Sequence, residues 1–251
     1  MIPADNGYEA KFDFPEWEGS PRVSYLLATV PRSGSTYLSH LLWQTGCLGA
    51  PLEYLNFDPT GPYGHASESS VEQINLWQAA LRGRTSPNGV FGLKGFPMQF
   101  AALHSSNQRL LGDVMRGIFP SRPASRVIWL HRRDTTAHAI SYARAILSGV
   151  WRKEQEAMGR AEPEYSSIAI ERATQLIEDA EGAWAAMLAD LGITPLELWY
   201  EDVVADPSAA VEAVAAYLGV GLDPSAAIEV PEIGRQSQQG AKTWAERHSG
   251  A

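Results

Sequence analysis

A short run of small and hydroxyl-bearing residues, PRSGST at positions 31–36, stands between an apolar stretch and an amphipathic one. Gly34 permits a tight turn, and the hydroxyls of Ser33, Ser35 and Thr36 add hydrogen-bond donors to the backbone N–H groups at the start of a helix. A strand, a small-residue loop and a helix in this order form a binding site for phosphate. The pattern indicates a phosphate-binding loop; a plain strand–helix turn capped by Ser35 is the alternative.

The lysine of the mononucleotide-binding loop is missing from this run. Such loops end in Gly-Lys-Ser/Thr, whereas Gly34 is followed directly by Ser35 and Thr36, and the cation of the loop is Arg32. The lysine of that loop reaches the terminal phosphates of a nucleoside triphosphate, and the hydroxyl binds magnesium. The loop is therefore suited to an anion that needs neither contact.

A second stretch, HRRDTTAHAISYARA, places Arg132 and Arg133 at the end of an expected strand and Ser141 about two turns into the next helix. It lies in a basic segment, residues 122–153, which holds seven cations and one acid. Because arginine binds phosphate through two parallel hydrogen bonds, the stretch predicts a second phosphate site beside the first. The alternative is an ordinary surface Arg pair, with Ser141 facing a neighbouring helix.

Composition excludes several classes of protein. The net charge of −9 argues against a general nucleic-acid binder, and no apolar stretch approaches the length of a membrane span. A single cysteine, Cys47, and an N-terminus unlike a signal peptide predict a cytoplasmic protein. The six histidines show no metal-binding spacing, so no metal is expected.

Apolar periodicity predicts strands that alternate with helices. The expected strands are 22–30, 90–96, 126–131 and 195–202, and the expected helices are 36–45, 70–82, 134–148, 165–191 and 208–218. This order predicts a three-layer, P-loop-like α/β fold with a central parallel sheet flanked by helices. We expect one domain, 1–251, with an N-terminal extension, 1–21, and a polar, irregular C-terminal segment, 231–251.

Parallel strands bring their carboxyl ends to one edge of the sheet, and ligands bind there. Three loops should therefore meet at that edge: 31–36, 94–97 and 131–134.

Together, the two phosphate-binding stretches resemble sulfotransferases that use 3′-phosphoadenosine-5′-phosphosulfate as donor. Further segments are similar to the bacterial trehalose 2-sulfotransferase-like family: GAPLEYLN, PNGVFGLKGFPMQF, VIWLHRRD with AISYARAILSGVWR, and RQSQQGAKTWAER. The resemblance runs from about Tyr25 to Arg247, and the four segments occur in the same order as in the family.

The resemblance implies two groups of donor-binding residues. Those for the 5′-phosphosulfate are Arg32, Ser33, Gly34, Ser35 and Thr36. Those for the 3′-phosphate are Arg132, Arg133 and Ser141. The donor has no γ-phosphate and needs no metal, which accounts for the missing lysine; its product is adenosine 3′,5′-bisphosphate.

The resemblance also implies catalytic residues. Animal-type sulfotransferases use a His after the second strand, where this chain has Lys94-Gly95-Phe96. The bacterial family places a Glu in G-x-P-x-E, which is Glu53 here, so Glu53 is expected to be the base. Lys94 is expected at the sulfuryl or bridging oxygen, and Arg32 against the bridging oxygen. By pattern alone, Glu53 would be a solvated carboxylate and Lys94 the partner of a nearby acid.

Two further regions match the family more loosely. Arg235 and Gln236 belong to a C-terminal segment that is expected to close over the nucleotide. Trp151 and Arg152 follow the basic helix and are expected either at the acceptor or, for Trp151, in packing.

The sequence thus predicts transfer of a sulfuryl group to a hydroxyl of a carbohydrate or glycolipid, by direct in-line transfer. A P-loop small-molecule kinase is the first alternative, although Gly-Lys-Ser/Thr and a clear magnesium-binding acid are missing. A non-catalytic nucleotide-binding module is the second. The family resemblance also implies a homodimer.

Overall fold

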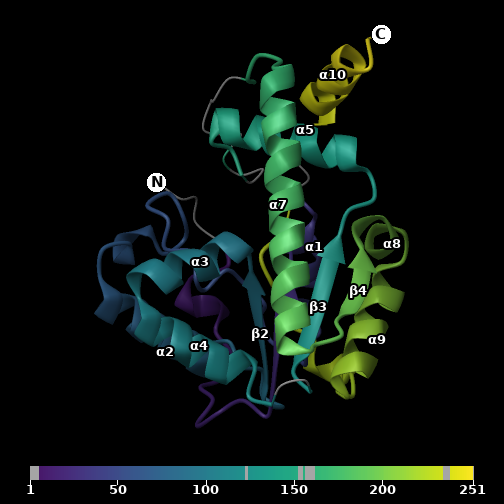
Figure 1. The fold of residues 1–251 in the computed structure, drawn as a ribbon. Helices are drawn as coiled ribbons and strands as arrows, with labels where there is room; N and C mark the ends of the chain where they lie inside the picture. Colours follow the sequence, from purple (N-terminus) through teal and green to yellow (C-terminus); the bar gives the residue numbers. More distant parts are fainter. Residues whose placement is uncertain (1–5, 122–123, 152–154, 156–161, 234–237, 251) are drawn as a thin grey trace.

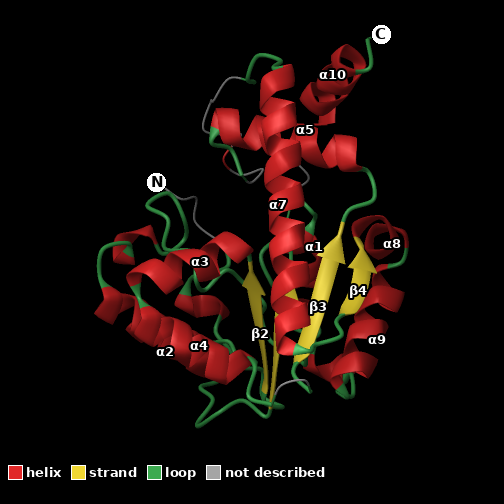
Figure 2. Cartoon of the chain, viewed as in Figure 1, coloured by secondary structure: helices red, strands yellow, loops and turns green. Residues whose placement is uncertain are grey.

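Four parallel strands form the centre of the computed structural model, which describes residues 6–121, 124–151, 155, 162–233 and 238–250 (Figures 1 and 2). The strands are β1 (Val23–Ala28), β2 (Val90–Gly95), β3 (Arg126–His131) and β4 (Leu196–Trp199). Their order in the sheet is β2-β1-β3-β4, and each neighbouring pair runs parallel. Their carboxyl ends therefore share one edge, as the alternation of strands and helices predicts.

Helices cover both faces of the sheet. Because successive residues of a strand point to opposite faces, Leu26 and Ala28 of β1 pack into one apolar core, and Tyr25 and Leu27 into another. The first core includes residues of α2 (Ser70–Gly83), α3 (Pro97–Ser106), α4 (Gln108–Ile118) and α7 (Ser167–Leu191). The second includes residues of α1 (Ser35–Gln44) and α9 (Pro207–Leu218). The three-layer α/β architecture is confirmed.

The remaining helices lie at the carboxyl edge or beyond it (Figure 1). Helix α5 (Thr135–Ser148) begins after a short connection from β3, and the short α8 (Tyr200–Ala205) follows β4 directly. Helix α10 (Gln238–His248) contacts α5. One-turn 3₁₀ segments occupy Ala10–Phe12, Gly64–Ala66 and Pro224–Ala226. Within the part of the chain that is described, no helix is long and apolar enough to span a membrane.

The C-terminal segment differs from the expectation of an irregular tail. Residues 238–248 form α10, and Trp244 is 2% exposed, with its ring 5.4 Å from that of Tyr165. The segment has few apolar residues, but Ala241 and Trp244 share one helical face and pack against α5 and α7. These two residues stabilise the helix only because they pack against α5 and α7, and the sequence pattern does not show that this packing surface exists.

Candidate functional site

The phosphate-binding loop connects the carboxyl end of β1 to the start of α1. Gly34 is the N-cap of α1 with a φ of 90°, and Arg32 has a φ of 70°, in the left-handed region that favours glycine. The first N–H groups of a helix have no partner within it, so those of α1 are turned toward the space in front of the loop. A side chain at position 34 would meet the Tyr200 ring, since a Cβ there would lie 2.1 Å from Tyr200 Cδ2.

Four successive carbonyls between β1 and α1 accept hydrogen bonds, three from side chains elsewhere in the chain and one from the loop itself. Trp184 Nε1 donates to the Thr29 carbonyl at 2.9 Å, and the Ser33 N–H donates to that of Val30 at 3.2 Å. His138 Nε2 lies 2.8 Å from the Pro31 carbonyl, and Arg132 Nη1 donates to the Arg32 carbonyl at 3.1 Å. With its carbonyls engaged, the strained backbone of the loop is held in one conformation.

His138 makes its bond as a neutral imidazole. The pKa of His138 is lowered to about 4, mainly because burial disfavours the charged ring. The nearby guanidinium groups of Arg132 and Arg32 also lower this pKa, and the hydrogen bond to Pro31 acts in the opposite direction. A carbonyl only accepts, so the hydrogen sits on Nε2.

Arg32, Ser141 and Arg132 are brought together, as the sequence predicts. Arg32 Nε donates to Ser141 Oγ at 3.1 Å, and Arg32 Nη1 donates to the Trp151 carbonyl at 2.5 Å. The guanidinium of Arg132 lies 5.1 Å from the centre of the Tyr200 ring, and its Nε is buried without a partner among the described residues. Arg32 and Arg132 thus place two cationic groups beside the loop at the N-terminus of α1, which fits an anionic ligand.

Arg133 has a different environment from Arg132. Both of its Nη atoms donate to the Asp202 carboxylate at 2.6 Å, and its backbone N–H donates to Glu201 Oε2. The hydrogen bonds from the Arg133 guanidinium lower the pKa of Asp202. Arg133 therefore links the end of β3 to α8, and both of its Nη atoms are already paired with Asp202.

Ser33 is also oriented away from the loop surface. It has no exposed area, and its hydroxyl is bonded to that of Thr29. Its backbone N–H donates to the Val30 carbonyl at 3.2 Å, so both polar donor groups of Ser33 are already bonded within the chain.

Glu53 and Lys94 form a buried ion pair beside this loop. Lys94 Nζ lies 3.0 Å from Glu53 Oε1 and donates to Thr36 Oγ1 at 3.1 Å. The side chains of Lys94 and Glu53 are 1% and 15% exposed. The Lys94 N–H donates to the Leu52 carbonyl at 3.0 Å, which holds the Glu53 segment against the end of β2. Glu53 is thus neither solvated nor remote: the pair connects it to the first turn of α1.

Two more groups fix Glu53. Asn56 Nδ2 donates to Glu53 Oε2 at 2.7 Å, so both carboxylate oxygens have partners. The backbone N–H of Glu53 donates to Tyr8 Oη at 3.0 Å.

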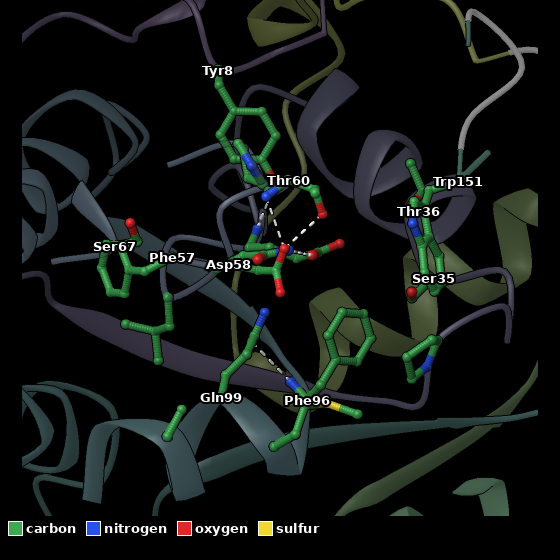
Figure 3. Close-up of a pocket in the computed structure, with 18 of the residues that line it drawn as sticks. Tyr8, Ser35, Thr36, Phe57, Asp58, Thr60, Ser67, Phe96, Gln99 and Trp151 are labelled. Atoms are coloured by element: carbon green, nitrogen blue, oxygen red, sulfur yellow. Dashed lines mark hydrogen bonds between the residues drawn. The ribbon is translucent and has the colours of Figure 1, made fainter. Parts of the chain in front are cut away.

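A cavity of about 590 Å³ lies in front of Glu53. That volume falls in the range of pockets that hold small molecules, about 300–1,000 Å³. Figure 3 shows Tyr8 and Phe57 on one side of it and Trp151, Ser35 and Thr36 on the opposite side. Its walls combine carboxylates, amides and hydroxyls with aromatic rings; besides those residues they include Asn6, Glu53, Asn56, Asp58, Thr60, Ser67, Gln73, Phe96 and Gln99.

Some predicted site residues lie outside the described residues, and some observed ones were not predicted. Arg152, Arg235 and Gln236 belong to the first group. Tyr8, His138 and Tyr200 belong to the second. Tyr200 directly follows β4, so the rule that ligands bind at strand ends could have indicated it. No pattern in the sequence indicates Tyr8.

Within the described ranges, no group of three or more His, Cys, Asp or Glu side chains could hold a metal ion.

Comparison with known proteins gives consistent matches. Trehalose 2-sulfotransferase of Mycobacterium tuberculosis is 28% identical, over 89% of this chain and 93% of that protein. Trehalose 2-sulfotransferase of Mycolicibacterium smegmatis is 27% identical, over 90% and 94%. Among solved structures, a sulfotransferase domain from the curacin biosynthetic pathway has a TM-score of 0.48 at 16% identity, covering 87% of this chain and 80% of that one. A sulfotransferase from Alicyclobacillus acidocaldarius has a TM-score of 0.45 at 14% identity, covering 90% and 91%.

The family model described as Stf0 sulphotransferase matches residues 24–250. That match contains the phosphate-binding loop, the Glu53–Lys94 pair and the basic stretch after β3. The chain belongs to the Stf0 sulphotransferase family.

Proposed function

We propose that this protein transfers a sulfuryl group from 3′-phosphoadenosine-5′-phosphosulfate to a hydroxyl of a sugar or glycolipid. The observation that carries the proposal is the chain of contacts from Glu53 through Lys94 to Thr36. It joins a carboxylate at the cavity to the first turn of α1, so that a base and an anion-binding loop share one site. The sulfotransferase family and its trehalose-modifying members support the reaction.

The donor would bind at the carboxyl edge of the sheet. The N-terminus of α1 with Arg32, Ser35 and Thr36 is suited to the 5′-phosphosulfate. The 3′-phosphate would lie nearer Arg132 and Ser141, with Arg133 joining when it leaves Asp202. The buried Nε of Arg132 has no hydrogen-bond partner among the described residues, which supports an anionic ligand there. When bound, the donor supplies the sulfuryl group that is transferred.

Glu53 would act as general base at the cavity. It accepts the proton of the attacking hydroxyl while the new oxygen–sulfur bond forms and the bond from sulfur to the bridging oxygen breaks. Lys94 and Arg32 carry the positive charge that stabilises negative charge on the sulfuryl and bridging oxygens in the transition state. The product nucleotide leaves as adenosine 3′,5′-bisphosphate.

The choice of nucleotide tests this proposal against phosphoryl transfer. Adenosine 3′,5′-bisphosphate should raise the melting temperature of the protein, since any ligand of the native state stabilises it. It should do so without magnesium, and ATP should do much less, because ATP lacks the 3′-phosphate. The measurement is thermal unfolding with each nucleotide, with and without magnesium, followed by mass detection of a sulfated product from a panel of sugars.

Equal stabilisation by ATP, or a strict need for magnesium, would favour a kinase. Stabilisation by the bisphosphate with no sulfated product from any acceptor would favour a binding module.

A further inference from the structure

The residues before β1 are built into the site instead of extending away from it. Residues 6–14, which we call the N-terminal strap, supply two side chains to the cavity wall, Asn6 and Tyr8. The strap continues along the end of α2, where the Phe14 N–H donates to the Gly83 carbonyl at 2.8 Å.

Arg84, directly after α2, holds the strap in place. Its side chain is 4% exposed and donates to the carbonyls of Gly7 at 2.9 Å and Glu9 at 3.0 Å. Its Nε lies 2.7 Å from Asp13 Oδ1, and its guanidinium lies 5.3 Å from the centre of the Trp43 ring. Because this buried guanidinium bonds three residues of one segment, it fixes the position of that segment.

The strap is also braced from within. The Glu9 carboxylate accepts the N–H groups of Asn6 and Gly7 at 2.9 Å, and Asn6 Oδ1 accepts that of Tyr8 at 2.9 Å. The Tyr8 ring packs edge-on against Tyr63 at 5.4 Å and Tyr54 at 6.5 Å. These contacts fix where the Tyr8 hydroxyl lies.

We infer that the strap is a wall of the acceptor site and that Tyr8 is a positioning residue for Glu53. The inference rests on the proposed function. Tyr8 Oη accepts the Glu53 backbone N–H at 3.0 Å, while Lys94 and Asn56 bond the two carboxylate oxygens. Both the backbone and the carboxylate of Glu53 are thus held, and the base is kept at one place relative to the cavity. A small displacement of a base costs rate, since proton transfer needs hydrogen-bond reach.

The test compares Tyr8→Phe with Tyr63→Phe. Both remove one hydroxyl from the same aromatic cluster, but only the first removes a partner of Glu53. Steady-state transfer from 3′-phosphoadenosine-5′-phosphosulfate to trehalose gives kcat and the KM of each substrate. We expect kcat of Tyr8→Phe to fall about tenfold or more, because the Glu53 N–H loses its acceptor in a partly buried site. The donor KM should stay unchanged, and Tyr63→Phe should behave as wild type.

Hydrogen exchange supplies a readout that does not depend on turnover. Tyr8→Phe should speed amide exchange at residues 52–56 and leave residues 31–36 as in wild type. An unchanged kcat, or equal losses in both variants with faster exchange along the whole strap, would overturn the inference, because Tyr8 would then only pack. If the wild-type protein does not sulfate trehalose, trehalose is not its acceptor, and hydrogen exchange alone tests the inference. Unchanged exchange at residues 52–56 in Tyr8→Phe would then overturn it, and faster exchange confined to those residues would support it.

Discussion

The Lys94 side chain is almost fully buried, yet it places an ammonium group next to the phosphate-binding loop. A buried cation needs a close anion, and Glu53 supplies it at 3.0 Å. The same contact places Glu53 at the cavity, so one ion pair has a structural role and, under the proposed function, a chemical one. Replacing Glu53 by Gln tests the chemical role, because the amide keeps the size of the side chain and loses its basicity.

Glu53→Gln should keep nucleotide binding and lose transfer. Removal of a general base typically costs about 10²–10⁴-fold in rate. Turnover of labelled donor and thermal stabilisation by adenosine 3′,5′-bisphosphate measure the two effects separately. Glu68→Gln, at an exposed position near α2, is the matched control and should leave both unchanged. A Glu53→Gln variant with near wild-type turnover would remove Glu53 from the mechanism, and one that loses the bisphosphate would make it structural.

His138 gives the protein a pH-dependent stability. Its pKa is about 4 in the folded chain, mainly because of burial, and about 6.5 in an unfolded chain. Between these values the unfolded state binds more protons, so the free energy of unfolding increases with pH. This contribution is present above about pH 6.5 and is lost as the pH falls toward 4; it amounts to at most about 3 kcal/mol.

His138→Gln should remove that dependence, since an amide N–H can still donate to the Pro31 carbonyl but does not titrate in this range. Urea unfolding between pH 4 and 7 measures it. His104→Gln changes an exposed histidine of α3 and should follow the wild-type curve. A His138→Gln curve parallel to wild type would show that His138 does not resist protonation in the folded state.

At the scale of elements, the junction between β1 and α1 depends on Gly34. Its φ of 90° is unfavourable for an alanine, and a Cβ would lie 2.1 Å and 2.5 Å from two atoms of the Tyr200 ring. Gly34→Ala should therefore push α8 and Arg132 away from the loop and weaken bisphosphate binding at least about tenfold, as loss of a charged hydrogen bond would. Titration calorimetry measures it.

Gly219→Ala is the control for backbone strain. Gly219 follows α9 with a φ of 69°, and a Cβ there would meet nothing within 4 Å. This variant should lose stability but keep its affinity for the bisphosphate. Equal loss of affinity in both variants would mean that strain, and not the contact with Tyr200, controls the site.

Elements whose signal is local could be predicted from the sequence. The four strands and the helices α1, α2, α5, α7 and α9 lie within a few residues of their expected bounds. Helices α3, α4, α8 and α10 were not expected, and α8 begins at Tyr200, within the expected strand 195–202. Gln108–Ile118 packs Leu110 and Val114 into the core and is amphipathic, whereas α3 buries few residues and starts with a proline. Short helices of this kind are stabilised by tertiary packing more than by their own residues.

At the scale of the whole molecule, the candidate site could likewise be predicted where its residues carry a local signal, but not where it depends on contacts between distant parts of the chain. The loop 31–36, Arg132, Ser141, Glu53 and Lys94 were all predicted, and the structure brings them to one edge of the sheet. Their donor-binding and catalytic roles stay predictions. Tyr8 could not be found, because its bond to Glu53 joins residues 45 positions apart and depends on a strap held by Arg84.

The strand order has a consequence for how the chain reaches this state. β1 comes first in the chain but lies inside the sheet, with Tyr25 paired to Gly92 on one side and to Arg126 on the other. Both pairings close long loops, whose entropy must be overcome before the contacts stabilise anything, so refolding should be slow. The phosphate-binding loop takes its bonds from Trp184, His138 and Arg132, all later in the chain than β2. Helices can form early in refolding, but the ability to bind a nucleotide should return last.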